Sequence, residues 1–358
     1  AGWNQVNIGI NDHFNSVLFM SSTHGLIAGN HGIYFTTTGG GTASDWTRFT
    51  FTNDPSYLEL YNNCQFKKIA VYSDYTVYIC GTDTVNKRAI IFKLDLSNLK
   101  YSFAYVGLKN SSLNALAIIN SYLFAVGNNG LVLTSSNFTD FTKVETGLSN
   151  NLFSVYPKKN TVYAMAGDGV FIHIDANQRV YNHLSDSIRS LNYNQDRDKF
   201  LAFGNKHIRY ENYKKKKREF TNYDFAPLYA TSSFNIGQNY YVSTNHGIYY
   251  QNGPLSEILE YMPSSNNLSL NDVYFYGFEK GYAVGNNGVF IKTTDSGGGS
   301  KPYATSNVIP NCKDTITTLH GSSGTGIWCK WLLNNKLIAS SCSINYVFET
   351  AGKFNLDY

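Results

Sequence analysis

The sequence predicts an all-β protein in which a repeated four-stranded unit forms a seven-bladed β-propeller. Aromatic residues make up 15% of the chain and charged residues only 15%, a balance typical of strands rather than of solvated helices. A unit of roughly forty residues also recurs, and its copies share one kind of tight turn. The 358 residues leave room for one large repeat domain and a smaller second domain.

The repeat is clearest in the segments 14–38, 113–136 and 271–294. In each copy a first alternating strand leads through a polar turn into a second strand that ends in Ala-Gly or Val-Gly. A tight turn and a third strand rich in β-branched and aromatic residues follow. Each copy therefore predicts three short antiparallel strands.

The tight turns share a glycine in their centre. Their central pairs are His31-Gly32, Asn129-Gly130, Asp168-Gly169, His246-Gly247 and Asn287-Gly288. A two-residue hairpin of type I′ needs positive φ at both positions, which Gly and Asn adopt at the least cost. Two degenerate copies over 66–94 and 188–210 bring the count to seven, the first of them with a longer loop over 82–88.

The two ends of the repeat region predict how the ring closes. Most copies continue into a fourth strand, such as 45–49 or 141–144, whereas the last copy runs into the glycines 297–299 without one. The segment 3–8 has the pattern of a fourth strand, so we expect it to pair with the last blade and to remove an open sheet edge. A β-solenoid is the competing fold, but its shorter coils would not need such an N-terminal strand.

The segments after the third strands are degenerate Asp boxes. Residues 293–297 fit the Ser/Thr-x-Asp-x-Gly core, and residues 37–46 keep the glycines and Trp46. With these boxes and the Gly-Asn-Asn-Gly turns, residues 1–305 resemble the BNR-repeat propellers, most of all the branch similar to the photosystem II assembly factor. The resemblance implies structural roles for the box residues. Sialidases share the repeat but add three substrate-binding arginines, and most arginines of this chain lie outside the first strands.

A second domain is expected over residues 306–358. A strand with Trp331 is followed by the pattern Y-x-F-x-x-x-G-x-F-x-L over 346–356, which is similar to PKD-like immunoglobulin-fold domains. The β-sandwich would be partial, so we expect the chain to be part of a longer protein. Chains of this kind resemble exported surface proteins of Bacteroidota, many of which leave the cell by type IX secretion.

The five cysteines fall into two groups. Three of them lie in the small C-terminal segment, where a disulfide would stabilise most, and they are the candidates for such a bond in an oxidising compartment: Cys312, Cys329 and Cys342. We expect Cys64 and Cys80 to be free thiols that pack as small apolar side chains.

Candidate binding residues lie in the turns between second and third strands, on the face where propeller ligands usually bind. The candidates are His31, Asn129, Asp168, His246 and Asn287. Amide and aromatic groups suit sugar hydroxyls, although the turns themselves require the same Asn-Gly pairs. A metal site would need three or four converging ligands. Because His31 and His246 lie in separate units, we predict no metal and no other cofactor.

One run of five basic residues follows a third strand. Lys214, Lys215, Lys216, Lys217 and Arg218 are candidates for contact with an anionic partner, although such runs are also common in solvated loops. Elsewhere the basic residues are scattered and the net charge is only +4, which argues against nucleic acid as a partner. No run of 18 apolar residues is present, so no transmembrane helix is expected.

These observations predict a non-catalytic secreted or cell-surface binding and adhesion module whose loops meet a glycan or a protein. The chain contains no G-x-S-x-G, H-E-x-x-H or P-loop motif. Two alternatives stay open. One is a component of a membrane-associated assembly or secretion complex, and the other is a sialidase-like carbohydrate-active enzyme with a carboxylate pair near the axis.

Overall fold

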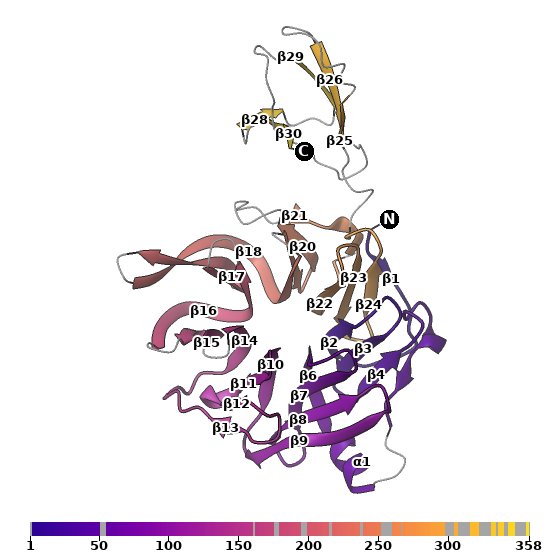
Figure 1. Cartoon of the computed structure of the whole chain (residues 1–358), viewed down its shortest axis with the longest axis vertical. Helices are drawn as coiled ribbons and strands as arrows, with labels where there is room; N and C mark the ends of the chain where they lie inside the picture. Colours follow the sequence, from indigo (N-terminus) through magenta and orange to yellow (C-terminus); the bar gives the residue numbers. More distant parts are fainter. Residues whose placement is uncertain are drawn as a thin grey trace.

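The structure is a computed structural model, and the β-sheets formed by β1 to β24 are arranged radially around a common centre (Figure 1). It describes residues 2–50, 55–159, 162–174, 179–194, 199–214, 217–236, 239–251, 260–265, 267–297, 304–306, 316–321, 331–333, 336–339, 343–347 and 356–357.

Four of the antiparallel sheets have four strands each, and no ladder joins one of these sheets to another. The first contains β2 (Phe14–Phe19), β3 (Gly25–Gly29), β4 (Ile33–Thr36) and β5 (Thr47–Arg48). The second contains β6 (Cys64–Val71), β7 (Thr76–Asp83), β8 (Arg88–Asp95) and β9 (Lys100–Lys109). The third contains β10 (Leu113–Ile119), β11 (Tyr122–Gly127), β12 (Val132–Ser135) and β13 (Thr142–Lys143). The fourth contains β22 (Leu270–Tyr276), β23 (Lys280–Gly285), β24 (Phe290–Thr293) and β1 (Asn4–Gln5).

The rest of the ring is one continuous order of eight strands, β14 to β21. Their bounds are Leu152–Lys159 (β14), Val162–Ile174 (β15), Arg179–Asn194 (β16), Lys199–Lys214 (β17), Lys217–Ile236 (β18), Asn239–Thr244 (β19), Gly247–Gln251 (β20) and Glu260–Tyr261 (β21). The prediction of seven separate blades is thus wrong for residues 152–261. The ring contains four separate four-stranded blades, and its remaining strands form a single eight-stranded sheet. The reason is that β15, β16, β17 and β18 each run unbroken from one ladder into the next.

The innermost strands close into a ring. β2, β6, β10, β14, β16, β18 and β22 contact one another in this cyclic order, and β22 returns to β2. Second strands such as β3 and β23 are buried along almost their whole length, because both of their faces pack against neighbouring sheets. Their sequences are accordingly nearly continuous apolar runs instead of alternating ones. The core is therefore a series of apolar layers between adjacent sheets.

The N-terminal strand closes the ring as predicted. β1 pairs antiparallel with β24, Asn4 opposite Lys292, and the backbone N–H of Val6 adds a hydrogen bond to the carbonyl of Phe290 at 2.9 Å. Before this strand, the backbone N–H of Gly2 donates to the carboxylate of Asp295 at 3.0 Å. β1 has only two ladder residues. Contacts of the neighbouring residues, such as Gly2 with Asp295 and Trp3 with Phe275, therefore also fix the N-terminal segment to the last blade.

The described residues contain few helices, and none of these helices was predicted. α1 (Pro55–Asn62) follows β5 and packs against the sheet of β6 to β9 through Tyr61, which is fully buried. Short 3-10 helices lie at Ala43–Asp45, Asn128–Gly130 and Pro263–Ser265. Residues 55–62 are too few to show the repeat of apolar residues every three to four positions that predicts a helix.

The strands beyond the ring form two sheets of three. They are β25 (Ala304–Ser306), β26 (Ile316–Gly321), β27 (Trp331–Leu333), β28 (Lys336–Ala339), β29 (Ser343–Val347) and β30 (Leu356–Asp357). The domain boundary at 305/306 and the partial PKD-like sandwich stay predictions. Cys312, Cys329 and Cys342 lie outside the described residues, whereas Cys64 and Cys80 are buried free thiols, as expected.

Candidate functional site

A bulge at the same place in every innermost strand points one side chain toward the axis. The ladder to the second strand skips one residue in each case, which is the fourth residue of the ladder in β6 and the second in the other six. A bulge inserts one residue and redirects the next side chain. The residues that follow the bulges form an axial ring: Ser16, Lys68, Ala115, Ser154, Ser190, Ser232 and Asp272.

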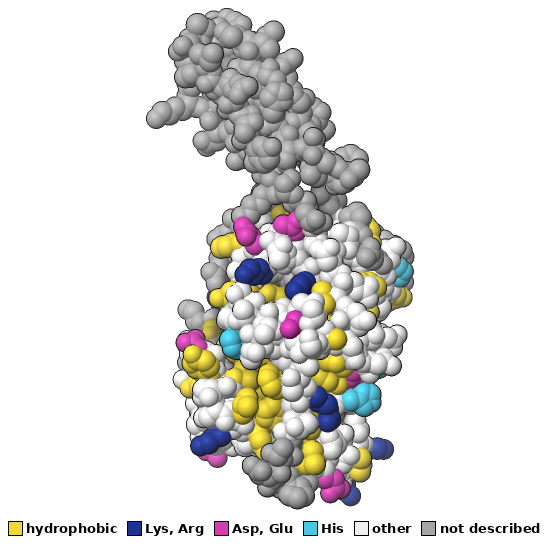
Figure 2. Space-filling model, turned by 90° about the vertical axis from the view of Figure 1, so that its right-hand side faces the viewer, with side chains coloured by type: hydrophobic (Ala, Val, Ile, Leu, Met, Phe, Trp, Pro, Cys, Tyr) yellow, Lys and Arg dark blue, Asp and Glu magenta, His cyan; other side chains and the backbone are white. Residues whose placement is uncertain are grey.

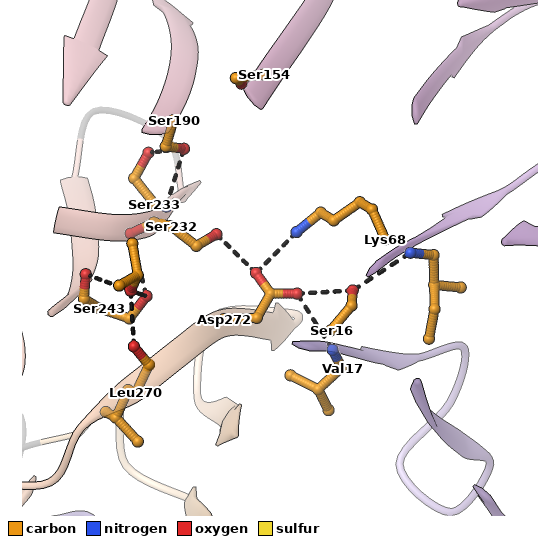
Figure 3. A network of polar contacts seen from close by, with 12 residues as sticks. Ser16, Val17, Lys68, Ser154, Ser190, Ser232, Ser233, Ser243, Leu270 and Asp272 are labelled. Atoms are coloured by element: carbon orange, nitrogen blue, oxygen red, sulfur yellow. Dashed lines mark hydrogen bonds and ion pairs between the residues drawn. The ribbon is translucent and has the colours of Figure 1, made fainter. Parts of the chain in front are cut away.

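Asp272 is the member of this axial ring on which hydrogen bonds from several strands converge, and it is only 1% exposed (Figure 3). One carboxylate oxygen accepts hydrogen bonds from the Ser16 hydroxyl at 2.8 Å and from the Val17 backbone N–H at 3.1 Å. The other oxygen accepts from the Ser232 hydroxyl at 2.6 Å and from the Lys68 ammonium at 2.7 Å. Three first strands besides its own thus supply donors to one carboxylate, and a buried charge needs such partners.

The other half of the axial ring is made of hydroxyl and amide groups. The Leu191 backbone N–H donates to the Ser154 hydroxyl at 3.0 Å, and the Ser233 backbone N–H donates to the Ser190 hydroxyl at the same distance. The Asn192 amide donates to the Ser233 hydroxyl at 2.6 Å. Four of the axial side chains, Ser16, Ser154, Ser190 and Asp272, thus accept a hydrogen bond from the next first strand around the axis.

The bulged residue itself connects neighbouring units. The Asn15 amide donates to the side-chain oxygen of Asn30 at 2.9 Å and to the carbonyl of Phe66, in the next unit, at 2.8 Å. The same pair of bonds recurs from Asn114 to Asn128 and Leu152, and from Asn271 to Asn286 and Phe14. We call these contacts the asparagine clasps. They account for the first Asn of the repeated turns without any ligand.

Glycine ends the second strands for a steric reason. A Cβ at Gly127 would overlap the carbonyl oxygen of Ser112, directly before the first strand of the same unit. Gly81, Gly167, Gly204 and Gly285 face the corresponding carbonyl in their own units. The recurring Ala-Gly and Val-Gly pairs are thus required by the close approach of two strands at the bulge.

His31, the first predicted binding residue, lies against a buried carboxylate. Its Nδ1 is 2.7 Å from Asp12, which is 3% exposed, while the His31 side chain itself is 73% exposed. Asp12 also accepts hydrogen bonds from the Tyr34 hydroxyl at 3.0 Å and from the His31 backbone N–H at 3.0 Å. Burial, with the neighbouring Asp12 charge, raises the pKa of Tyr34 above its usual value. Neither His31 nor Gly32 has positive φ, so this turn is not of type I′; Asp12 holds it instead.

Asn129 and Asn287 have the predicted turn conformation. Their φ values are 53° and 56°, and the following glycines, Gly130 and Gly288, are also positive. The N–H of Gly130 donates to the carbonyl of Asn150, and that of Gly288 to the carbonyl of Asp12, each at 2.7 Å. Both turns are thus fixed to the segment that leads into the next first strand.

Asp168 and His246 differ from the prediction. Asp168 lies within the continuous strand β15 at a bulge and accepts a hydrogen bond from the Ser187 hydroxyl at 2.7 Å. His246 lies in the turn between β19 and β20 and is exposed, and its backbone N–H donates to the Thr244 hydroxyl at 3.0 Å. The five candidates lie in separate hairpins, four in turns and Asp168 within β15, and the structure does not bring them together into one site.

The basic run forms the end of a hairpin. Lys214 ends β17 and pairs with Lys217 at the start of β18, and the next pair joins Tyr213 and Arg218. Lys215 and Lys216 lie outside the described residues, as do the side chains of the other three basic residues. On either side of the two undescribed residues, the long strands β17 and β18 stay paired as far as Lys214 and Lys217.

A groove lies beside α1, at the rim of the second blade. It has a volume of about 440 Å³ and is bounded by the helix, by the β7–β8 turn and by β9. Its lining residues are Tyr57, Glu59, Leu60, Asn63, Asn86, Arg88, Phe103 and Val106. Tyr57 stacks on Phe103 with ring centroids 5.7 Å apart. The groove therefore combines an aromatic and aliphatic floor with polar groups at one end, as binding sites commonly do.

A buried ion pair shapes the polar end of this groove. Asp83 is fully buried and accepts hydrogen bonds from Arg88 at 2.8 Å and from the Asn86 amide at 2.9 Å. Burial alone would raise the pKa of Asp83, but the hydrogen bonds from Asn86 and Arg88 outweigh it and hold the pKa of the carboxyl below its usual value. The predicted long loop over 82–88 is thus a compact turn of 84–87 between paired strands.

Two parts of the site were not predicted from the sequence. Alignment of the repeats at 14–16, 113–115 and 270–272 would place Asp272 where the other copies have Ser16 or Ala115. An acid at a position where five of the other six copies have Ser or Ala is the signal that could have identified it. The groove had no such signal, because it depends on the packing of α1 against β9.

Among the described side chains on the face shown in Figure 2, positive and negative charges are interspersed and form no basic stripe. Among the described residues, no helix is long and apolar enough to cross a membrane. The described histidines, cysteines and carboxylates also form no group of three that could hold a metal ion.

Comparison with solved structures identifies the architecture. YCF48 from Cyanidioschyzon merolae superposes with a TM-score of 0.63 at 14% identity, over 82% of this chain and 99% of that one. The fold is a β-propeller. YCF48 bound to D1 peptide gives a TM-score of 0.63 at 11% identity, over 82% of this chain and 97% of that one. The extracellular domain of a one-component system from B. thetaiotaomicron gives 0.62 at 12% identity, over 89% of this chain and 45% of that one.

No family model matches this propeller, and no curated protein matches it. At these identities the likeness to solved structures concerns the fold alone. The BNR-repeat and PKD-like resemblances stay predictions.

Proposed function

We propose that this propeller is a non-catalytic binding module whose rigid ring presents the groove beside α1 to a protein partner. The observation that carries the proposal is the groove itself, in which Tyr57, Leu60, Phe103 and Val106 provide apolar surface next to Arg88. Aromatic side chains and Arg are the residue types enriched where proteins bind one another.

The axial ring supports a structural role over catalysis. A glycosidase needs two carboxyl groups that flank the scissile bond, whereas Asp272 is the one carboxylate in the axial ring. Both of its oxygens already accept two hydrogen bonds each. Substrate would have to displace Lys68 or the serines to reach it.

The solved propellers support a protein as the ligand. One of them is described as bound to D1 peptide, and another is an extracellular domain. We propose by analogy that this chain binds a peptide segment, and that it does so outside the cell. The same proposal includes export by type IX secretion and a role in adhesion at the cell surface.

We also infer that the eight-stranded part contains three further units, which would make seven in all. The partner changes in β16 at Ser187 to Ile188 and in β18 at Tyr229 to Ala230 support this count. Directly after each change, the same strand contains the axial bulge.

A site-specific photo-crosslinker tests the proposed function. We would place it at Val106 in the groove and, as a matched control, at Thr139, which is exposed on another blade. Incubation with the surface fraction of the producing cells should give a protein adduct at Val106 alone, and excess unlabelled chain should abolish it. Equal adducts at both positions, or none, would contradict the proposal. Saturable binding to a glycan array that a Val106 substitution reduces would favour a glycan instead.

A further inference from the structure

β9 differs from the outer strands of the other blades in its length. It has ten residues, whereas β1, β5, β13 and β21 have two each. Each of these strands ends its sheet order, and β8 is the only described strand that pairs with β9. A long outer strand leaves a row of backbone N–H and C=O groups available to a further strand.

The groove lies along this strand. Phe103 and Val106 of β9 line it, and Val106 is 40% exposed. Two residues further, Leu108 is 86% exposed, and in the adjacent β7–β8 turn Val85 is 67% exposed. A strand added to β9 would direct every second side chain to one face. Apolar side chains at alternate positions could therefore enter the groove.

Two lysines lie next to Arg88 at the polar end of the groove, whose lining also includes the carboxylate of Glu59. Lys109 lies opposite Arg88 in the ladder, and Lys87 directly precedes Arg88. Among the described residues Arg88 is paired with Asp83, while no carboxylate pairs with Lys87 or Lys109. An acidic side chain of a ligand would complement this end.

A second copy of this chain fits the strand less well. Antiparallel pairing of two β9 strands would bring Lys100 of one copy near Lys109 of the other, and like charges across a ladder are unfavourable. Two register shifts in the β8–β9 ladder also keep β9 from being flat, which disfavours pairing between two long edges.

We propose that β9 binds an extended segment of a partner protein as a fifth strand of its blade. The segment places apolar side chains in the groove and an acidic side chain beside Lys109. This inference rests on the proposed function and specifies the chemistry of the partner. Strand addition of this kind takes affinity from main-chain hydrogen bonds and specificity from alternate side chains.

The first test compares two synthetic peptides on the full chain. Both alternate Val and Thr over eight residues, and one ends in two Glu while the other ends in two Lys. Fluorescence anisotropy should show the acidic peptide binding about fivefold more tightly, the range of an exposed charge contact. Lys109→Glu should remove that preference. Lys100→Glu, at the far end of the same strand, is the matched control and should keep it. Equal binding of both peptides to the unaltered chain would overturn the charge assignment.

The second test identifies the binding mode. Methylation of single backbone nitrogens in the acidic peptide should weaken binding about tenfold at alternate residues only, because every second N–H faces β9. Amide exchange of Tyr105 to Leu108 should slow in the complex. If neither effect occurs while the crosslinker at Val106 still captures a protein, strand addition is wrong and the proposed function stands. If the crosslinker also captures nothing, the proposed function fails.

Discussion

Asp272 shows how one residue can order the centre of a ring. It has the only negative charge in the axial ring, and it receives donors from three other first strands. The partner Lys68 is 36% exposed, so water screens part of this ion pair. The carboxylate itself is buried, and its value to the fold comes from the hydrogen bonds that satisfy it.

We expect Asp272→Asn to lower the free energy of unfolding by about 2–4 kcal/mol, since it leaves a lysine without its counter-charge and replaces one acceptor oxygen by an NH2 donor. Urea unfolding measures the change. Glu145→Gln is the matched control, because Glu145 forms an exposed ion pair with Lys143 at 3.0 Å and should contribute less than about 1 kcal/mol. Equal losses in the two variants would show that the axial network adds nothing.

Gly127 provides a second test at this scale. We expect Gly127→Ala to cost about 1–3 kcal/mol, since the new methyl group must displace the backbone carbonyl of Ser112. Gly41→Ala is the control: the nearest atoms there belong to the flexible side chains of Lys292 and Asp45. Thermal unfolding of both variants checks this, and an unchanged Tm for Gly127→Ala would refute the steric explanation.

The two described thiols should be unreactive in the folded chain. Burial raises the pKa of Cys80 to about 12 and also raises the pKa of Cys64, so little thiolate exists at neutral pH. With iodoacetamide at about pH 8, peptide mapping should show both cysteines unmodified in buffer and fully alkylated in urea. Rapid alkylation of either one in buffer would mean that its blade opens readily.

Among the elements, the β7–β8 hairpin has its own dependence on pH. The hydrogen bonds from Asn86 and Arg88 lower the pKa of Asp83 in the fold, while an unfolded aspartate titrates at about pH 4. The unfolded state therefore binds the proton first, and stability from ionised Asp83 is complete above about pH 4. It is lost as the pH falls through the lower pKa of the folded state.

We expect Asp83→Asn to destabilise the chain at neutral pH, and the difference from the unaltered chain to shrink between about pH 5 and pH 2. Denaturant unfolding across that range measures the difference directly. A gap that stays constant or widens toward low pH would show that Asp83 is not stabilised as the anion.

The sequence predicts strands better than the contacts between them. The turns at Asn129 and Asn287 were predicted correctly, because positive φ at two successive residues has a local signature in Asn-Gly. His31 has no such signature, and its turn depends on Asp12, a residue outside the hairpin. The axial bulges and the helix α1 were not predicted, since both are set by packing against a neighbouring sheet.

At the scale of the whole molecule, closure of the ring was predicted because the repeat pattern lacks its fourth strand at one end and has a spare one at the other. The structure pairs β1 with β24 and buries Trp3 to 3% exposure against Phe275, with ring centroids 5.7 Å apart. The number of separate blades was not predicted correctly, because ladders joined by unbroken strands leave no turn residues in the sequence.

Trp3→Ala tests the latch. We expect a loss of about 3–5 kcal/mol in unfolding free energy and faster amide exchange in β24. Phe124→Ala is the comparison: Phe124 is 1% exposed in β11 and packs against Tyr163, with ring centroids 4.5 Å apart, outside the closing blade. It should cost a similar amount without selective exchange in the closing blade. If Trp3→Ala changes exchange uniformly around the ring, the N-terminal residues do not act as a latch.

One set of contacts between units runs in a single direction. Asn15, Asn114 and Asn271 each donate to the first strand of the following unit. Four axial side chains accept from the first strand of the following unit: Ser16, Ser154, Ser190 and Asp272. A stretch of gene that encodes one unit therefore encodes both halves of the interface: the groups that contact the following unit and the groups that receive the same contacts from the preceding unit. Tandem duplication adds a unit that already fits its neighbours, so a ring of this kind can lengthen without inventing a new interface.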